Sequence, residues 1–150
     1  MATNFSKVIG LLTVFVLISV HSFGQTYTRA ELTPEWQLIS QQDGVKIYVK
    51  EQHCDLNKNG KPVVFSMLRL VNETSDKKSI TYNYIHQYDQ GCEGCNENPE
   101  RVFNFELESN SQIEEDCRIS HAGLSLTIHN PNVTSTWKFE SVSINILSIK

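Results

Sequence analysis

Residues 41–50 read QQDGVKIYVK, and this stretch decides the class of fold. Asp43-Gly44 is a turn signal, because glycine accepts the positive φ angles that tight hairpin turns require. After the turn, every second residue from Val45 to Val49 is apolar, and the residues between them are more polar. This period of two predicts a strand with one buried face, the second strand of a hairpin whose first strand begins at Trp36.

The same alternation recurs along the chain, separated by polar segments that contain Gly, Asn or Pro. The further predicted strands are Val63–Val71, Ser79–His86, Arg101–Leu107, Gln112–Ile119, Leu124–Ile128 and Trp137–Leu147. In the last of these the phase shifts at Glu140-Ser141, which predicts a β-bulge. A helical period is absent from the sequence, apart from a single expected turn with Thr33 as N-cap and Pro34 after it. Seven or eight short strands at even spacing predict an all-β fold, a single antiparallel immunoglobulin-like β-sandwich, with a small barrel as the alternative.

The first 24 residues have the pattern of a secretory signal peptide. Val8–Val20 is free of charge but shorter than the roughly 20 apolar residues of a membrane span. Ser22 and Gly24 supply the small residues that precede a cleavage site. We therefore expect a signal peptide at 1–24, a β-sandwich domain at 25–150 without a membrane span, and a secreted or periplasmic location.

The composition is that of an ordinary globular protein and excludes several classes. Of the 150 residues, 39% are hydrophobic and 20% charged, and the formal net charge is −4. These values argue against a disordered chain, a polytopic membrane protein and a basic nucleic-acid binder. Acidic residues concentrate between positions 93 and 116, which predicts either an orientation toward a basic partner or simply a solvated, solubilising surface.

Residues 65–84, FSMLRLVNETSDKKSITYNY, resemble the strand–turn–strand unit of immunoglobulin-like or fibronectin-III-like bacterial extracellular domains. The chain from Trp36 onward is also similar to small uncharacterised secreted or periplasmic proteins of Gram-negative bacteria. These proteins place one cysteine after the first hairpin, a Cys-x-x-Cys in mid-chain and a fourth cysteine later. The resemblance implies a β-sandwich outside the cytoplasm, and it implies no activity.

Four cysteines follow the predicted signal peptide, at Cys54, Cys92, Cys95 and Cys117. An even number in an exported chain favours disulfides, and three pairings are possible. The preferred pairing joins Cys92 to Cys95 in a tight ring that Gly94 permits, and Cys54 to Cys117 across a long loop. A meander would bring all four to one end of the sandwich.

Two functional alternatives use the same cysteines. A thioredoxin-like redox pair needs a helix N-terminus at the Cys-x-x-Cys, whereas here the acidic Glu93, Glu97 and Glu100 raise the pKa of a thiol. A zinc site would need all four cysteines as thiolates, which an oxidising compartment disfavours.

Other motifs are weaker. Asp55–Gly60 matches the first half of a calcium loop, but the twelfth position is Ser66 instead of glutamate, so a hairpin turn is favoured. His53, His86, His121 and His129 show no metal-pair spacing. Nucleophile-elbow and phosphate-loop motifs are absent from the sequence. We therefore expect a non-enzymatic binding or structural protein without a cofactor, whose partner is a protein or a cell-surface component and not nucleic acid. A small-ligand carrier is the further alternative if the strands enclose a cavity.

Overall fold

The computed structural model describes residues 25–56, 60–95, 101–118, 121–132 and 137–150, so the predicted signal peptide lies outside the described residues. The described chain consists of strands and connections, without an α-helix. The strands are β1 (Gln25–Thr28), β2 (Gln37–Gln42), β3 (Val45–Cys54), β4 (Val63–Asn72), β5 (Lys78–Tyr88), β6 (Gly91–Glu93), β7 (Val102–Leu107), β8 (Ser111–Glu114), β9 (Ser125–His129) and β10 (Phe139–Ile149). Within the described residues, no helix is long and apolar enough to cross a bilayer.

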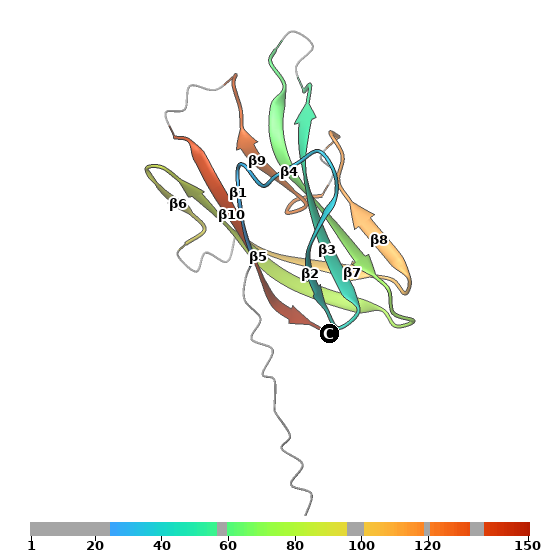
Figure 1. The fold of residues 1–150 in the computed structure, drawn as a ribbon. Helices are drawn as coiled ribbons and strands as arrows, with labels where there is room; N and C mark the ends of the chain where they lie inside the picture. The colour runs from blue at the N-terminus through green and yellow to red at the C-terminus, as the bar shows by residue number, and fades with distance from the viewer. Residues whose placement is uncertain (1–24, 57–59, 96–100, 119–120, 133–136) are drawn as a thin grey trace, which may run out of the picture.

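The strands form two antiparallel sheets that pack face to face (Figure 1). One sheet has the order β1-β10-β5, with β6 and β7 following one another along the free edge of β5. The other has the order β2-β3-β4, with β8 and β9 sharing the free edge of β4. The predicted antiparallel β-sandwich is confirmed, and the sheets do not close into a barrel.

The described part of the chain has ten strands, where the sequence predicted seven or eight. The additional β1 and β6 are short and lack a run of alternating apolar residues. The strand order also differs from the ABED and CFG sheets of immunoglobulin domains, since β2, β3 and β4 form a meander within one sheet. The architecture is therefore a sandwich with a strand order of its own.

Details within the elements follow the local sequence. The ladder between β10 and β5 shifts register between Phe139 and Ser141, which confirms the predicted bulge, and it shifts again between Ile146 and Ser148. The expected helical turn at Thr33-Pro34 is wrong, because this segment is an irregular bend that leads into β2. The strand predicted over Gln112–Ile119 ends earlier, because its pairing with β4 runs only from Ser111 to Glu114.

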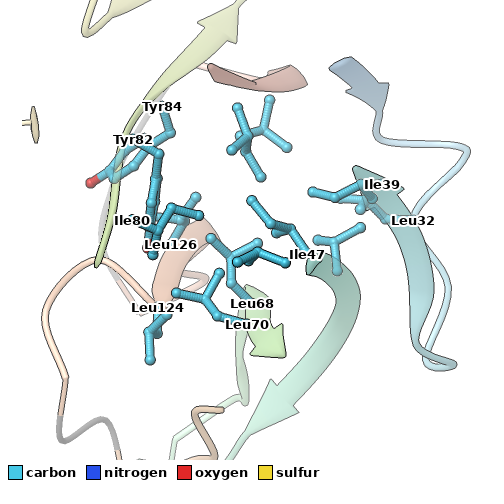
Figure 2. Close-up of a cluster of buried hydrophobic side chains, with 14 of the residues drawn as sticks. Leu32, Ile39, Ile47, Leu68, Leu70, Ile80, Tyr82, Tyr84, Leu124 and Leu126 are labelled. Atoms are coloured by element: carbon cyan, nitrogen blue, oxygen red, sulfur yellow. The ribbon is translucent and has the colours of Figure 1, made fainter. Parts of the chain in front are cut away.

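The core lies between the inner faces of the two sheets, as the period-two pattern requires (Figure 2). Alternate residues of β3 and β5 are buried, and almost all of β4 is buried because this central strand packs on both faces. The aliphatic side chains of β3 and β4 meet Ile80, Tyr82 and Tyr84 from β5. The side chains that the alternating pattern predicts to face inward are thus the ones that form the core.

Asn72 joins two turns at one end of the sandwich. Its buried side chain donates to the carbonyl oxygens of Asp76 and Glu108, at 2.7 and 2.9 Å, and its Oδ1 accepts from the backbone N–H of Thr74 at 3.0 Å. The amide is buried, and its hydrogen bonds satisfy backbone groups from both turns. The β4–β5 turn is thereby tied to the segment after β7.

Candidate binding site

The site is built on the inner face of β5. The alternation in this strand places Tyr82, Tyr84, His86 and Tyr88 on one face, and we call this row the aromatic ladder. Neighbouring rings extend it sideways: Tyr84 stacks on Phe103 with ring centroids 5.4 Å apart, and His86 meets Phe139 edge-on at 5.7 Å. The ladder begins in the core and ends near the surface, since Tyr82 is fully buried and Tyr88 is partly exposed.

A cleft of about 420 Å³ opens between the two sheets at the outer end of the aromatic ladder. One wall comes from the β5 sheet. The other comes from β9, which is one of the two short strands at the edge of the opposite sheet. We call it the β5–β9 cleft. Its lining residues are Tyr84, His86, Tyr88, Glu93, Arg101, Ser125, Leu126, Thr127, Ile128, His129, Asn130 and Trp137.

Arg101 holds the cleft wall together across the gap between β6 and β7. Its guanidinium donates to the hydroxyl of Tyr84 at 2.7 Å and forms an ion pair with the carboxylate of Glu93. The guanidinium carbon also lies 5.6 Å from the centroid of the Tyr84 ring, in cation–π range. Because the two charges offset one another, this wall presents polar atoms without net charge.

His86 is the buried titratable group of the cleft, with 3% of its surface exposed. Burial, and then the positive charge of Arg101, lower the pKa of this histidine to about 4. The imidazole is therefore neutral at pH 7, with one nitrogen that donates and one that accepts.

The two nitrogens of His86 have different surroundings. Nδ1 lies 3.4 Å from the hydroxyl of Tyr88 and 3.6 Å from Oε2 of Glu93. The nearby carboxylate favours the proton on Nδ1, which leaves Nε2 as the acceptor. Nε2 is buried and has no hydrogen-bond partner within the described part of the chain. A buried polar atom without a partner costs free energy, and because Nε2 has almost no accessible surface it is not open to a ligand in the cleft.

Trp137 and Tyr88 form the aromatic rim of the cleft. Their rings meet edge to face with centroids 5.7 Å apart, and Trp137 is 48% exposed. An adjoining hollow shares both rings and Glu93 and is also lined by Cys92. The Cys92–Cys95 segment therefore borders the candidate site.

The four cysteines form two disulfides, and no free thiol remains. Cys54 joins Cys117, with Cα atoms 5.2 Å apart, and Cys92 joins Cys95, with Cα atoms 5.8 Å apart. These are the preferred pairs of the sequence analysis. Gly94 within the second ring has φ +88°, and a Cβ there would lie 2.6 Å from the carbonyl oxygen of Tyr84, so this position requires glycine.

The two disulfides are anchored in different sheets of the sandwich. Cys54 ends β3 and belongs to one sheet, whereas Cys92 lies in β6 of the other sheet. Where the chain is described, no three His, Cys, Asp or Glu side chains come together in an arrangement that could hold a metal ion. The separation follows from the crossing of the chain from β4 to β5, which changes sheets between the two cysteine pairs.

The acidic residues between 93 and 116 are largely used in ion pairs with bases from other elements. Lys77 meets Glu106 and Glu108, and Arg69 pairs with Glu114 across the β4–β8 ladder. Charge neutralisation of this kind leaves a mixed surface instead of a continuous acidic one. Such exposed pairs contribute little stability individually.

The remaining motifs lie apart from the cleft, with one exception. Of the calcium-like loop, Asn57–Asn59 lie outside the described residues, and the flanking ends pair directly, Cys54 with Val63. His53 contacts Glu51 at 2.8 Å, whereas His129 lines the cleft.

Sequence reasoning missed His86 and Arg101 as site residues. The available signal was the alternation of the strand SITYNYIH. His86 stands at one of its buried positions, where an ionisable side chain is unusual. Its approach to Arg101 and β9 depends on how the sheets pack, which no local pattern encodes.

Together these features define a class: a disulfide-linked antiparallel β-sandwich with an aromatic, polar cleft between its sheets. No family model and no curated protein matches this chain. A solved structure, the Salmonella enterica trimeric lipoprotein SadB, is similar with 14% sequence identity and a TM-score of 0.38. The match covers 85% of this chain and 63% of that one, so the chain spans less than two thirds of it.

Proposed function

We propose that this protein is a non-enzymatic, extracytoplasmic binding protein and that the β5–β9 cleft is its binding site. The observation that carries the proposal is the cleft itself: a hollow of about 420 Å³ with aromatic rings and several convergent polar groups. This combination is typical of small-ligand sites, where rings supply contact area and a few polar atoms fix orientation. The cleft is large enough for a small molecule.

The state of the ionisable groups supports binding over catalysis. A general base near neutral pH needs a pKa close to 7, whereas the pKa of His86 is about 4. The carboxylate of Glu93 is engaged by Arg101, and the hydroxyl of Tyr84 accepts from the same guanidinium. These groups are arranged to hold one another in position.

The disulfides support the location outside the cytoplasm, because such bonds persist in oxidising compartments. They also bear on the redox alternative: Cys92 lies in strand β6 and not at the start of a helix, so no helix dipole lowers the pKa of its thiol. We assign the Cys92–Cys95 pair a structural role, as a clasp that holds Glu93 at the cleft.

The proposal is tested by soaking crystals of the chain from residue 25 onward in a library of small aromatic and polyhydroxylated fragments. We expect bound fragments to concentrate between Trp137 and β9. The variant Trp137→Ala removes the ring at the cleft opening and should weaken that binding, whereas Trp36→Ala, whose ring lies against Lys50 and Arg69, should not. Fragments that bind elsewhere, or a cleft that stays empty at saturating concentrations, would contradict the proposal.

Export gives a separate prediction. The mature protein is expected to begin at Gln25, since Ser22 and Gly24 satisfy the small-residue rule and cleavage after Gly24 leaves β1 complete. Intact-mass measurement of protein from the periplasm or medium checks this. A mass that includes Met1–Gly24 would show that the segment is not a cleaved signal peptide.

A further inference from the structure

The charge of the β5–β9 cleft restricts the class of ligand. The positive charge of Arg101 is engaged by the carboxylate of Glu93, so neither an anion nor a cation finds an uncompensated opposite charge on this wall. Breaking the pair to bind a charged group would leave the other partner uncompensated in a partly buried site. The charge balance therefore favours a ligand without net charge.

The rim of the cleft favours a ligand with an apolar face. Trp137 is 48% exposed at the cleft opening, beside the ring of Tyr88. The face of an indole carries negative partial charge and attracts polarised C–H groups. A pyranose ring presents such C–H groups on one face and hydroxyls around its edge, so it can stack on Trp137 while its hydroxyls remain free to bond.

The remaining lining supplies partners for those hydroxyls. Donors and acceptors come from Ser125, Thr127 and Asn130 on the β9 side, opposite the Glu93–Arg101 pair. A hydroxyl that both donates and accepts suits such a mixed lining, whereas a hydrocarbon chain would leave these groups unsatisfied.

We propose that the ligand of the β5–β9 cleft is a neutral saccharide, stacked on Trp137 and hydrogen-bonded to the polar groups of β9. This inference rests on the proposed binding function of the cleft and names its ligand class. Nucleic acids, lipids and charged metabolites are the classes that it excludes.

The test uses the chain from residue 25 with Trp36→Phe, which leaves Trp137 as the only tryptophan. Trp36 is not among the residues that line the cleft, and its ring centroid lies 4.7 Å from Lys50 Nζ and 4.3 Å from Arg69 Cζ. The probes are four neutral tetrasaccharides: glucose and N-acetylglucosamine units, each in α-1,4 and β-1,4 linkage. We expect at least one of them to change the Trp137 emission in a saturable way with one site per chain.

Calorimetry on single variants, made without the Trp36→Phe replacement, then tests whether the saccharide binds in the cleft. Trp137→Ala should weaken the affinity for the tetrasaccharide that binds by at least tenfold. Trp137→Tyr should keep the affinity within about threefold of the unaltered chain, because a tyrosine ring still offers a stacking face. Trp36→Ala is the matched control and should leave affinity unchanged. Affinity that Trp137→Ala does not reduce would overturn the proposal.

The two proposals fail in different ways. If aromatic fragments occupy the cleft but no tetrasaccharide changes the Trp137 emission, the saccharide assignment is wrong and the binding function stands. If neither fragments nor saccharides bind there, both proposals are wrong. Binding of a charged sugar phosphate in place of the neutral tetrasaccharides would show that the Glu93–Arg101 pair opens, which also overturns the saccharide assignment.

Discussion

Replacing Cys54 and Cys117 together by alanine is expected to lower the free energy of unfolding by about 4 kcal/mol. The two residues are separated by 63 positions, so their disulfide closes a long loop and removes much of the entropy of the unfolded chain. Cys54 is also fully buried among Val63, Phe65 and Met67 in a small second core, where the shorter alanine leaves space. For a domain of this size, the melting temperature should fall by roughly 10–20 °C.

The matched control is the double replacement Cys92→Ala/Cys95→Ala. This ring spans a sequence separation of only 3, so the same entropy relation gives a loss of about 2 kcal/mol. Urea unfolding of both variants without reductant, compared with the wild type at constant m-value, measures the two losses. Equal losses would show that loop length does not govern the contribution of these disulfides.

The sequence predicted the sandwich because the strands carry their own signals. The apolar parity of Val45–Val49 and of Ile80–Tyr84 identifies the buried face, and Asp43-Gly44 marks the turn, which has positive φ at both residues. The phase shift of the apolar pattern at Glu140-Ser141 indicated the bulge directly. Local pattern therefore defines the elements and the faces they bury.

The strand order and the short edge strands were not predictable in the same way. β6 spans only Gly91–Glu93 and pairs because it folds back on β5, without an apolar alternation of its own. β8 and β9 pair with β4 after the chain has passed through the other sheet as β5, β6 and β7, which a meander does not predict. Long-range pairing depends on the global packing of the sheets, so residue patterns within single strands do not specify it.

The candidate site lies where these long-range pairings meet. Glu93 reaches Arg101 only because β6 and β7 share one edge of β5, and Asn130 faces them only because β9 is the opposite edge. The sequence singled out the cysteines, whose chemistry is visible locally, and overlooked the aromatic cleft that they border. In this protein the disulfides could be identified from spacing, whereas the cleft required the packed sheets.

Acid is expected to destabilise the protein through His86. The pKa of its imidazole is about 4 in the folded protein and about 6.5 when unfolded, mainly because burial disfavours the charged form. Between these values the unfolded chain binds a proton that the folded chain does not, so stability falls as the pH decreases from about 6.5 to about 4. The shift corresponds to a loss of about 3 kcal/mol, which is complete below pH 4.

Comparison with His86→Phe isolates this contribution from those of the carboxylates. Phenylalanine keeps a ring between Tyr84 and Phe139, so the variant should fold, but it carries no titratable group. Urea unfolding at pH 7 and pH 4 should show a loss about 3 kcal/mol larger in the wild type than in the variant. Glu93 and Arg101 face the imidazole with opposite charges, and their ion pair makes burial the dominant cause of the difference. Equal acid losses in the two proteins would mean that burial does not lower the pKa of His86 in the folded protein.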